Sequence, residues 1–105
     1  MAVIDPAGWY EVRKTAACTA WPEATERHPL GSVANGVVVA EAVFGVFAEL
    51  DEVPDAMALF DIATWPRGRP LPAIGTRLCG RVVGHRPGHD DHPGQLRLAP
   101  LDQGP

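Results

Sequence analysis

The fold is decided by residues 32–62, which read SVANGVVVAEAVFGVFAELDEVPDAMALFDI. Valine and phenylalanine are frequent in this stretch, and both favour strands because their side chains pack well on a pleated surface. The apolar runs are too short for buried helices, and a polar turn around Pro54 separates the last two of them. We therefore predict three consecutive strands, at residues 32–42, 43–50 and 57–62.

Two further strands are predicted downstream. The connection at 63–75 is expected to be irregular because it holds three prolines and two glycines. Strands are predicted at 76–85 and at 95–99, where Leu96 and Leu98 alternate with polar residues. Five strands with a long connection between the third and fourth predict an all-β fold, a small Greek-key barrel, whose closure leaves no exposed sheet edge.

The N-terminal section reads differently from the rest. Asp5-Pro6 is a plausible helix start, and apolar residues recur from Trp9 onward at helical spacing, which predicts a short helix over roughly 7–20. Trp21-Pro22 is expected to end that helix, because proline disfavours helical geometry in the residue before it. Trp9 is expected to anchor the helix on the barrel. The predicted organisation is a helical extension and linker at 1–30, the barrel at 31–100 and a frayed tail at 101–105.

Several short motifs resemble those of the S1 RNA-binding domain family, and they follow one another in the same order and with similar spacing. Gly31 to Gly36 resembles the opening of these domains, and Phe44-Gly45-Val46-Phe47 resembles their Phe-Gly-apolar-Phe segment. Further similar segments lie at Leu59–Ile62, at Gly75 before the fourth strand, and at Gln95–Ala99. The resemblance implies a stand-alone, five-stranded OB-type barrel that binds single-stranded RNA.

The resemblance also implies a binding face that carries Phe44 and Phe47, since unpaired bases stack on aromatic rings. Residues three apart on a strand point to opposite faces unless a bulge intervenes, so at least one of these rings is expected in the core. Whether both contact a ligand stays open at this stage.

The chain departs from the family's pattern at several positions of that face. The family's base-contacting histidine falls on Asp61, a basic position falls on Gln95, and a family aspartate falls on Arg86. Arg97 keeps a basic position, and Arg81 replaces a family lysine. The predicted RNA-binding residues are Phe44, Phe47, Asp61, Arg81, Arg86, Gln95 and Arg97.

Further contacts are considered in two places. Trp65 lies in the long connection beside two arginines, a combination that suits stacking with phosphate contact. A loop rich in histidine and aspartate follows the fourth strand, but it lacks a rigid element to fix metal geometry, so no metal site is predicted. The possible additional RNA contacts are Trp65, Arg67, Arg69 and His85, and the loop residues are His85, His89, Asp90, Asp91 and His92.

The charge distribution keeps a second function open. The formal net charge is −4, with three basic against ten acidic residues in 1–62 and six arginines against three aspartates in 63–105. An acidic chain is a poor general polyanion binder. The alternative is therefore a protein-interaction module, an OB barrel that has lost RNA binding and docks on a partner such as a ribosome-associated protein.

No motif for catalysis, for a phosphate-binding loop or for a cofactor is present, so neither enzymatic activity nor a cofactor is predicted. Cys18 and Cys79 lie far apart without metal-ligand spacing, which suggests reduced thiols and a cytoplasmic location. No apolar run reaches the length of a membrane span, so no membrane association is expected.

Overall fold

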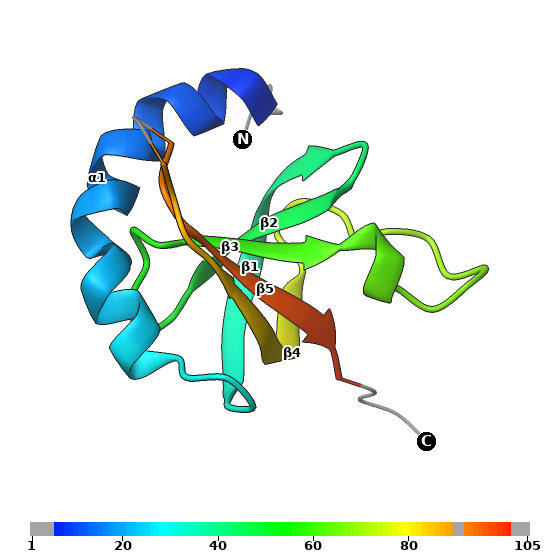
Figure 1. Cartoon of the computed structure of the whole chain (residues 1–105). Helices are drawn as coiled ribbons and strands as arrows, with labels where there is room; N and C mark the ends of the chain where they lie inside the picture. Colours follow the sequence, from blue (N-terminus) through cyan, green and yellow to red (C-terminus); the bar gives the residue numbers. More distant parts are fainter. Residues whose placement is uncertain (1–5, 90–91, 102–105) are drawn as a thin grey trace.

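The computed structural model describes residues 6–89 and 92–101. Within these ranges the chain forms one α-helix, five strands and one short 3-10 helix (Figure 1). In chain order they are α1 (Pro6–Arg27), β1 (Val33–Ala42), β2 (Gly45–Leu50), β3 (Met57–Asp61), η1 (Ile62–Thr64), β4 (Arg77–Arg86) and β5 (Gln95–Pro100).

The strands close into a barrel in the order β1-β2-β3-β5-β4, with β4 pairing back onto β1. Neighbouring strands are antiparallel except β3 and β5, which run parallel. Closure through a long connection between β3 and β4 is the OB-type arrangement. The predicted all-β barrel and its five strands are therefore confirmed, with bounds that differ by one or two residues.

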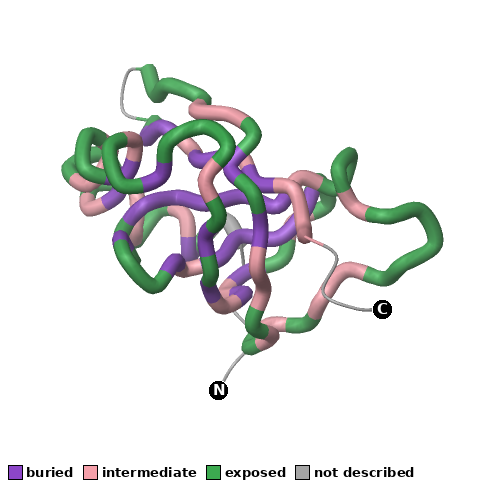
Figure 2. Tube along the Cα trace, turned by 90° about the horizontal axis from the view of Figure 1, so that it is seen from below, coloured by how far each residue is buried: buried purple, intermediate pink, exposed green. Residues whose placement is uncertain are grey.

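Alternation along the strands sorts side chains between the barrel interior and its outer surface. The interior is filled by even-numbered residues of β2, β3, β4 and β5, among them Val46, Phe60, Val82, Leu96 and Leu98, none more than 1% exposed. Odd-numbered residues of β2, β3 and β5 point outward. In Figure 2 the buried residues, in purple, run through the middle of the barrel, and exposed residues, in green, form most of the loops around it.

A register shift in β1 adds to the outer layer. Val38 pairs with Ala48, but Ala40 pairs with Phe47, so one extra residue lies between them. Such a bulge turns the following residues to the other face of the sheet. Ala40 accordingly joins a second apolar cluster, outside the barrel interior, whose buried members are Trp9, Ala17, Ala40, Phe47, Met57 and Leu59.

Helix α1 lies along one side of the barrel and covers this cluster (Figure 1). Trp9 is 7% exposed, and its ring centroid lies 4.8 Å from that of Phe47. Arg13 fixes the same part of the helix by donating to Glu49 Oε2 at 3.2 Å and to the carbonyl oxygen of Pro54 at 2.6 Å. The predicted anchoring of the helix by Trp9 is confirmed.

The predicted end of the helix at Trp21-Pro22 is wrong, because α1 continues through Pro22 to Arg27. A proline inside a helix removes one backbone hydrogen bond and costs about 3 kcal/mol. Here the added turns bury Ala24 completely and pack Trp21 against Gly94. A Cβ on residue 94 would overlap the indole of Trp21. Burial against the barrel therefore outweighs the local preference, and the helix ends just before Pro29.

No helix among residues 6–89 and 92–101 has both the length and the apolar character needed to span a membrane.

Candidate nucleic-acid interface

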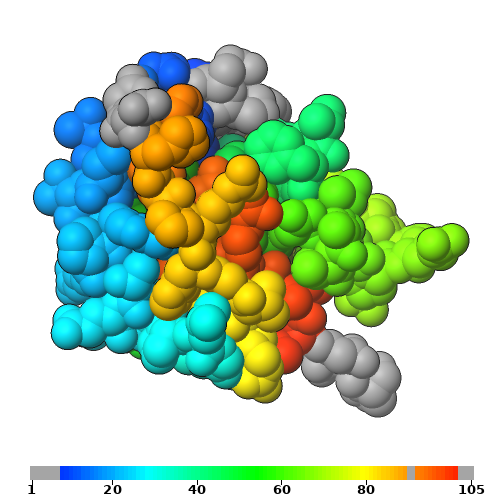
Figure 3. Space-filling view, in the orientation of Figure 1, coloured from blue at the N-terminus to red at the C-terminus, as the bar shows by residue number. Residues whose placement is uncertain are grey.

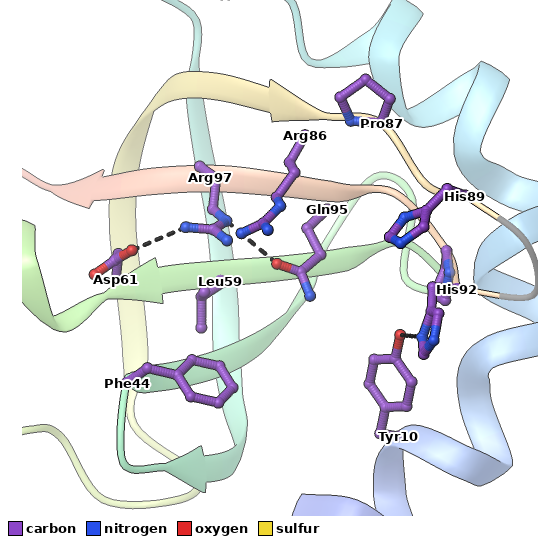
Figure 4. A pocket seen from close by; sticks show the side chains of 11 residues that line it. Tyr10, Phe44, Leu59, Asp61, Arg86, Pro87, His89, His92, Gln95 and Arg97 are labelled. Atoms are coloured by element: carbon purple, nitrogen blue, oxygen red, sulfur yellow. Dashed lines mark hydrogen bonds and ion pairs between the residues drawn. The ribbon is translucent and has the colours of Figure 1, made fainter.

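A groove of about 500 Å³ opens on the outer surface of the barrel. In Figure 3 the red residues of β5 lie recessed between the orange β4–β5 segment and the green residues of β2 and β3. Figure 4 shows its lining from close by. The lining residues are Tyr10, Phe44, Leu59, Asp61, Arg86, Pro87, His89, His92, Pro93, Gln95 and Arg97. Five of the seven predicted RNA-binding residues therefore meet in one place.

Phe44 presents an aromatic ring to the groove. It lies in the turn between β1 and β2 and is 47% exposed. The turn is held against β3 because the N–H of Ile62 donates to the carbonyl oxygen of Phe44 at 2.8 Å. Gly45 follows with φ +148°, and a Cβ there would overlap the carbonyl oxygen of Phe60. A glycine is thus required for this turn to approach β3 and to aim the ring.

The interpretation of Phe47 as a base-contacting residue is corrected by the structure. Its side chain points out of the barrel as the alternation predicts, but α1 covers it and only 2% is exposed. Its ring packs under Trp9 and meets Phe44 edge-on, with centroids 5.9 Å apart and planes at 90°. Phe47 supports the exposed ring of Phe44 and is not itself open to a base.

Arg97, Asp61 and Gln95 form a hydrogen-bonded chain across the groove floor (Figure 4). The strand register makes this possible, because Arg97 of β5 pairs with Leu59 of β3, two residues before Asp61. Arg97 Nη1 donates to Asp61 Oδ2 at 2.8 Å, and Arg97 Nε donates to Gln95 Oε1 at 3.2 Å. Asp61 therefore neutralises and positions Arg97. The side chains of both residues remain about a quarter exposed on the groove floor.

Arg86 supplies a cation that is not neutralised in this way. It ends β4, pairs in register with Gln95, and its side chain is exposed beside the groove. Within residues 6–89 and 92–101 its guanidinium forms no hydrogen bond or ion pair. Five N–H donors on an exposed guanidinium suit a phosphate oxygen.

Two of the predicted residues lie away from the groove. Arg81 pairs with Val33 on the β1–β4 side of the barrel, and its Nη1 donates to the carbonyl oxygen of Gly31 at 2.6 Å. His85 lies under α1, where its Nε2 is 2.6 Å from the carbonyl oxygen of His28 and its ring meets Trp21 edge-on. Neither residue lines the groove, so the structure does not support their assignment to this binding face.

The long connection between β3 and β4 is also separate from the groove. Trp65 is partly buried against the barrel core, and its Nε1 donates to the carbonyl oxygen of Pro70 at 3.1 Å. Arg67 and Arg69 are exposed on this connection and do not line the groove. The indole of Trp65 therefore has a structural partner, and the proposed additional contacts do not join the site.

Sequence reasoning missed the wall that α1 adds to the groove. Tyr10 Oη and His92 Nδ1 are 3.2 Å apart and join the helix to the β4–β5 segment, where the rings of His89 and His92 are 5.5 Å apart. No local signal pairs two residues 82 positions apart. Asp90 and Asp91 of the histidine-rich loop lie outside the described residues. In the part that is described, no three metal-ligating side chains gather.

Three groups with a shifted pKa lie outside the groove lining, namely His28, Asp51 and Arg77. His28 is 3% exposed and its Nε2 has no partner among the described residues, and burial lowers the pKa of its imidazole. Arg77 donates two hydrogen bonds to Asp51 at 2.9 and 3.2 Å, which lowers the pKa of the Asp51 carboxyl and raises the pKa of the Arg77 guanidinium. None of these residues lines the groove.

Comparison with solved structures finds barrels of the same kind. RNase R from Mycoplasma genitalium, in complex with ribose-methylated single-stranded RNA, matches 85% of the chain with a TM-score of 0.62 at 17% identity. The chain has an OB-type barrel fold. It covers only 15% of that RNase R chain, and the apo form matches 82% of the chain with a TM-score of 0.57 at 18% identity.

A second protein of similar fold is much shorter. GSP13 from Bacillus subtilis matches 67% of the chain with a TM-score of 0.50 at 24% identity, and 53% of its own length is covered. No protein-family model and no curated protein sequence matches the chain. The comparisons therefore bear on the fold, which agrees with the fold that the S1 resemblance implies.

Proposed function

We propose that the chain is a non-enzymatic module that binds single-stranded RNA in the groove between Phe44 and Arg86. The observation that carries the proposal is the placement, on one concave surface, of an exposed aromatic ring and of a guanidinium that forms no ion pair within the described part of the chain. Stacking on the ring and contact with a backbone phosphate are the two interactions that single-strand binders combine. The RNA held by the Mycoplasma RNase R chain is consistent with this use of the fold.

In this proposal each lining residue has its own role. Phe44 stacks on one base, and its ring is held in place by the buried Phe47. Arg86 binds a phosphate of the backbone. Arg97 and Gln95, fixed on the floor by Asp61, contact the edge of the stacked base. We expect modest affinity with a strong dependence on salt, since few cations line the groove, and we keep the expectation of a cytoplasmic protein.

The alternative, a protein-docking barrel, rests on the net charge of −4 and on four acidic residues expected near the binding face, Asp51, Glu52, Asp55 and Asp61. The structure pairs these carboxylates within the chain. Asp51 binds Arg77, Glu52 binds Arg27 at 3.2 Å, and Asp55 lies 3.7 Å from Arg13. They are thus less available to a basic partner than the sequence suggests, and RNA binding is the function that the geometry favours.

Titration of a fluorescently labelled RNA hexamer tests the proposal. We expect saturable binding that Phe44→Ala weakens and that Val43→Ala, at the neighbouring and 93% exposed position, leaves unchanged. An RNA duplex of the same length serves as a competitor and is expected to compete poorly. Absence of binding, or equal losses in the two variants, would overturn the assignment and favour a search for a protein partner.

A further inference from the structure

We propose that the groove selects uracil and guanine, which carry a keto oxygen at pyrimidine position 4 or purine position 6, over cytosine and adenine, which carry an amino group at that position. This inference rests on the proposed function and names the class of nucleotide that the same site takes. The preference follows from the hydrogen-bonding atoms on the groove floor that have no partner within the described part of the chain.

Gln95 presents its amino group to the groove. Arg97 Nε lies 3.2 Å from the Gln95 side-chain atom that it contacts. A guanidinium has donors and no acceptor, so the carbonyl oxygen of Gln95 must be the atom that faces Arg97. The amide nitrogen is therefore turned away from Arg97, as Figure 4 shows, and its two hydrogens are the atoms offered to a base.

The remaining guanidinium groups add donors. Arg97 uses Nε and Nη1 for Gln95 and Asp61, while its Nη2 forms no hydrogen bond within the described residues. Arg86 is exposed and lies in register with Gln95 on the neighbouring strand. Three side chains thus direct N–H groups into the same space, next to the ring of Phe44.

Both oxygens of the carboxylate on the floor already accept one hydrogen bond each. Asp61 Oδ1 accepts from the backbone N–H of Ala63 at 2.8 Å, and Asp61 Oδ2 accepts from Arg97 at 2.8 Å. A keto oxygen stacked over the floor would accept from Gln95 or Arg97. The amino group of cytosine or adenine would instead face the N–H groups of Gln95 and Arg97, donor against donor, and would leave them without an acceptor on the base, which disfavours binding.

Matched pairs of single-stranded RNA hexamers test the preference for a keto oxygen over an amino group. Hexamers of uridine and cytidine differ at position 4, keto or amino, and in the proton on N3. Hexamers of inosine and adenosine differ at position 6 and in the proton on N1, so stacking area is conserved within each pair. We expect uridine to bind at least about fivefold more tightly than cytidine, and inosine more tightly than adenosine by a similar factor. Binding is measured by fluorescence anisotropy at one salt concentration.

Substitution of Gln95 tests whether this residue causes the preference for uridine over cytidine. Gln95→Met keeps the length of the side chain and adds no charge, but it removes the amino donor. We expect it to bring the uridine-to-cytidine ratio close to one while thermal unfolding stays near that of the wild type. Gln95→Glu is a second variant, which supplies acceptors and is expected to lower the ratio to one or below.

The outcomes separate this inference from the function on which it rests. Equal affinity for uridine and cytidine, with binding that still depends on Phe44, would overturn base selection and leave RNA binding intact. A ratio unchanged in Gln95→Met would overturn the role of Gln95. Failure of every hexamer to bind would overturn both proposals.

Discussion

Replacing Arg86 and Phe44 separately divides the binding free energy into its salt-dependent and salt-independent parts. Arg86 lies at the groove without an intrachain partner among the described residues, so its loss removes one phosphate contact and breaks no ion pair of the fold. Each phosphate contact with a single strand contributes about 0.7 to the slope of log K against log salt. Arg86→Ala is therefore expected to reduce that slope by about 0.7.

The same arithmetic gives a measurable difference. Between 50 and 200 mM salt the wild type is expected to lose about 2.6-fold more affinity than Arg86→Ala, on the slope of about 0.7 per contact. Phe44→Ala is expected to weaken binding by roughly 5- to 150-fold, from about 1–3 kcal/mol of stacking, and to leave the slope unchanged. The assay is anisotropy titration of one RNA hexamer at four salt concentrations.

Arg67→Ala is the matched control, because it removes the same charge from an exposed position outside the groove. We expect it to leave the slope nearly at the wild-type value. An equal change of slope in Arg67→Ala and Arg86→Ala would refute the reasoning, since a diffuse electrostatic effect would then account for the salt dependence. A changed slope in Phe44→Ala would also contradict it.

Three further predictions concern the fold that holds the groove. Trp9→Ala removes an indole that is 7% exposed and packs on Phe47, and it is expected to lower the free energy of unfolding in urea titrations by about 3–5 kcal/mol. Val12→Ala, on the exposed face of α1, is the control and is expected to lower it by less than about 0.5 kcal/mol. Gly45→Ala is expected to lose about 1–3 kcal/mol from backbone strain alone, since its φ is +148°, and a wild-type melting temperature would show this reasoning wrong. Burial lowers the pKa of His28 below 6.5, so the unfolded chain takes up a proton at a higher pH than the folded chain does. The free energy of unfolding is therefore expected to reach its full value above pH 6.5 and to decrease as the pH falls below 6.5. An equally steep decrease in His28→Asn would exclude His28 as the origin.

Strand positions could be predicted from the sequence because they depend on local pattern. The valine- and phenylalanine-rich runs and the breakers between them mark the five strands. Alternation does not separate Phe44 from Phe47, because Phe44 lies in the turn before β2 and its ring contacts that of Phe47, which is buried under α1. Pro22 was misjudged for the opposite reason. Local preference ends a helix there, whereas the burial of Ala24 and Trp21 that keeps it helical depends on the barrel.

The candidate site was predictable only in part. The resemblance places Phe44, Arg86 and Arg97 on one face, and all three line the groove. It could not show that Asp61, 36 residues before Arg97, would pair with Arg97. Nor could it show that α1 would cover Phe47. Both facts arise from register and packing between distant segments, which no sequence window contains, and they decide which side chains remain open to a ligand.

Side-chain NMR of the chain with a uridine hexamer tests the central claim most directly. We predict that the largest shifts on titration fall on the ring protons of Phe44, the amide protons of Gln95, and the Nε–H groups of Arg86 and Arg97. Shifts that gather instead around Arg67 and Arg81, with the groove unchanged, would contradict the account.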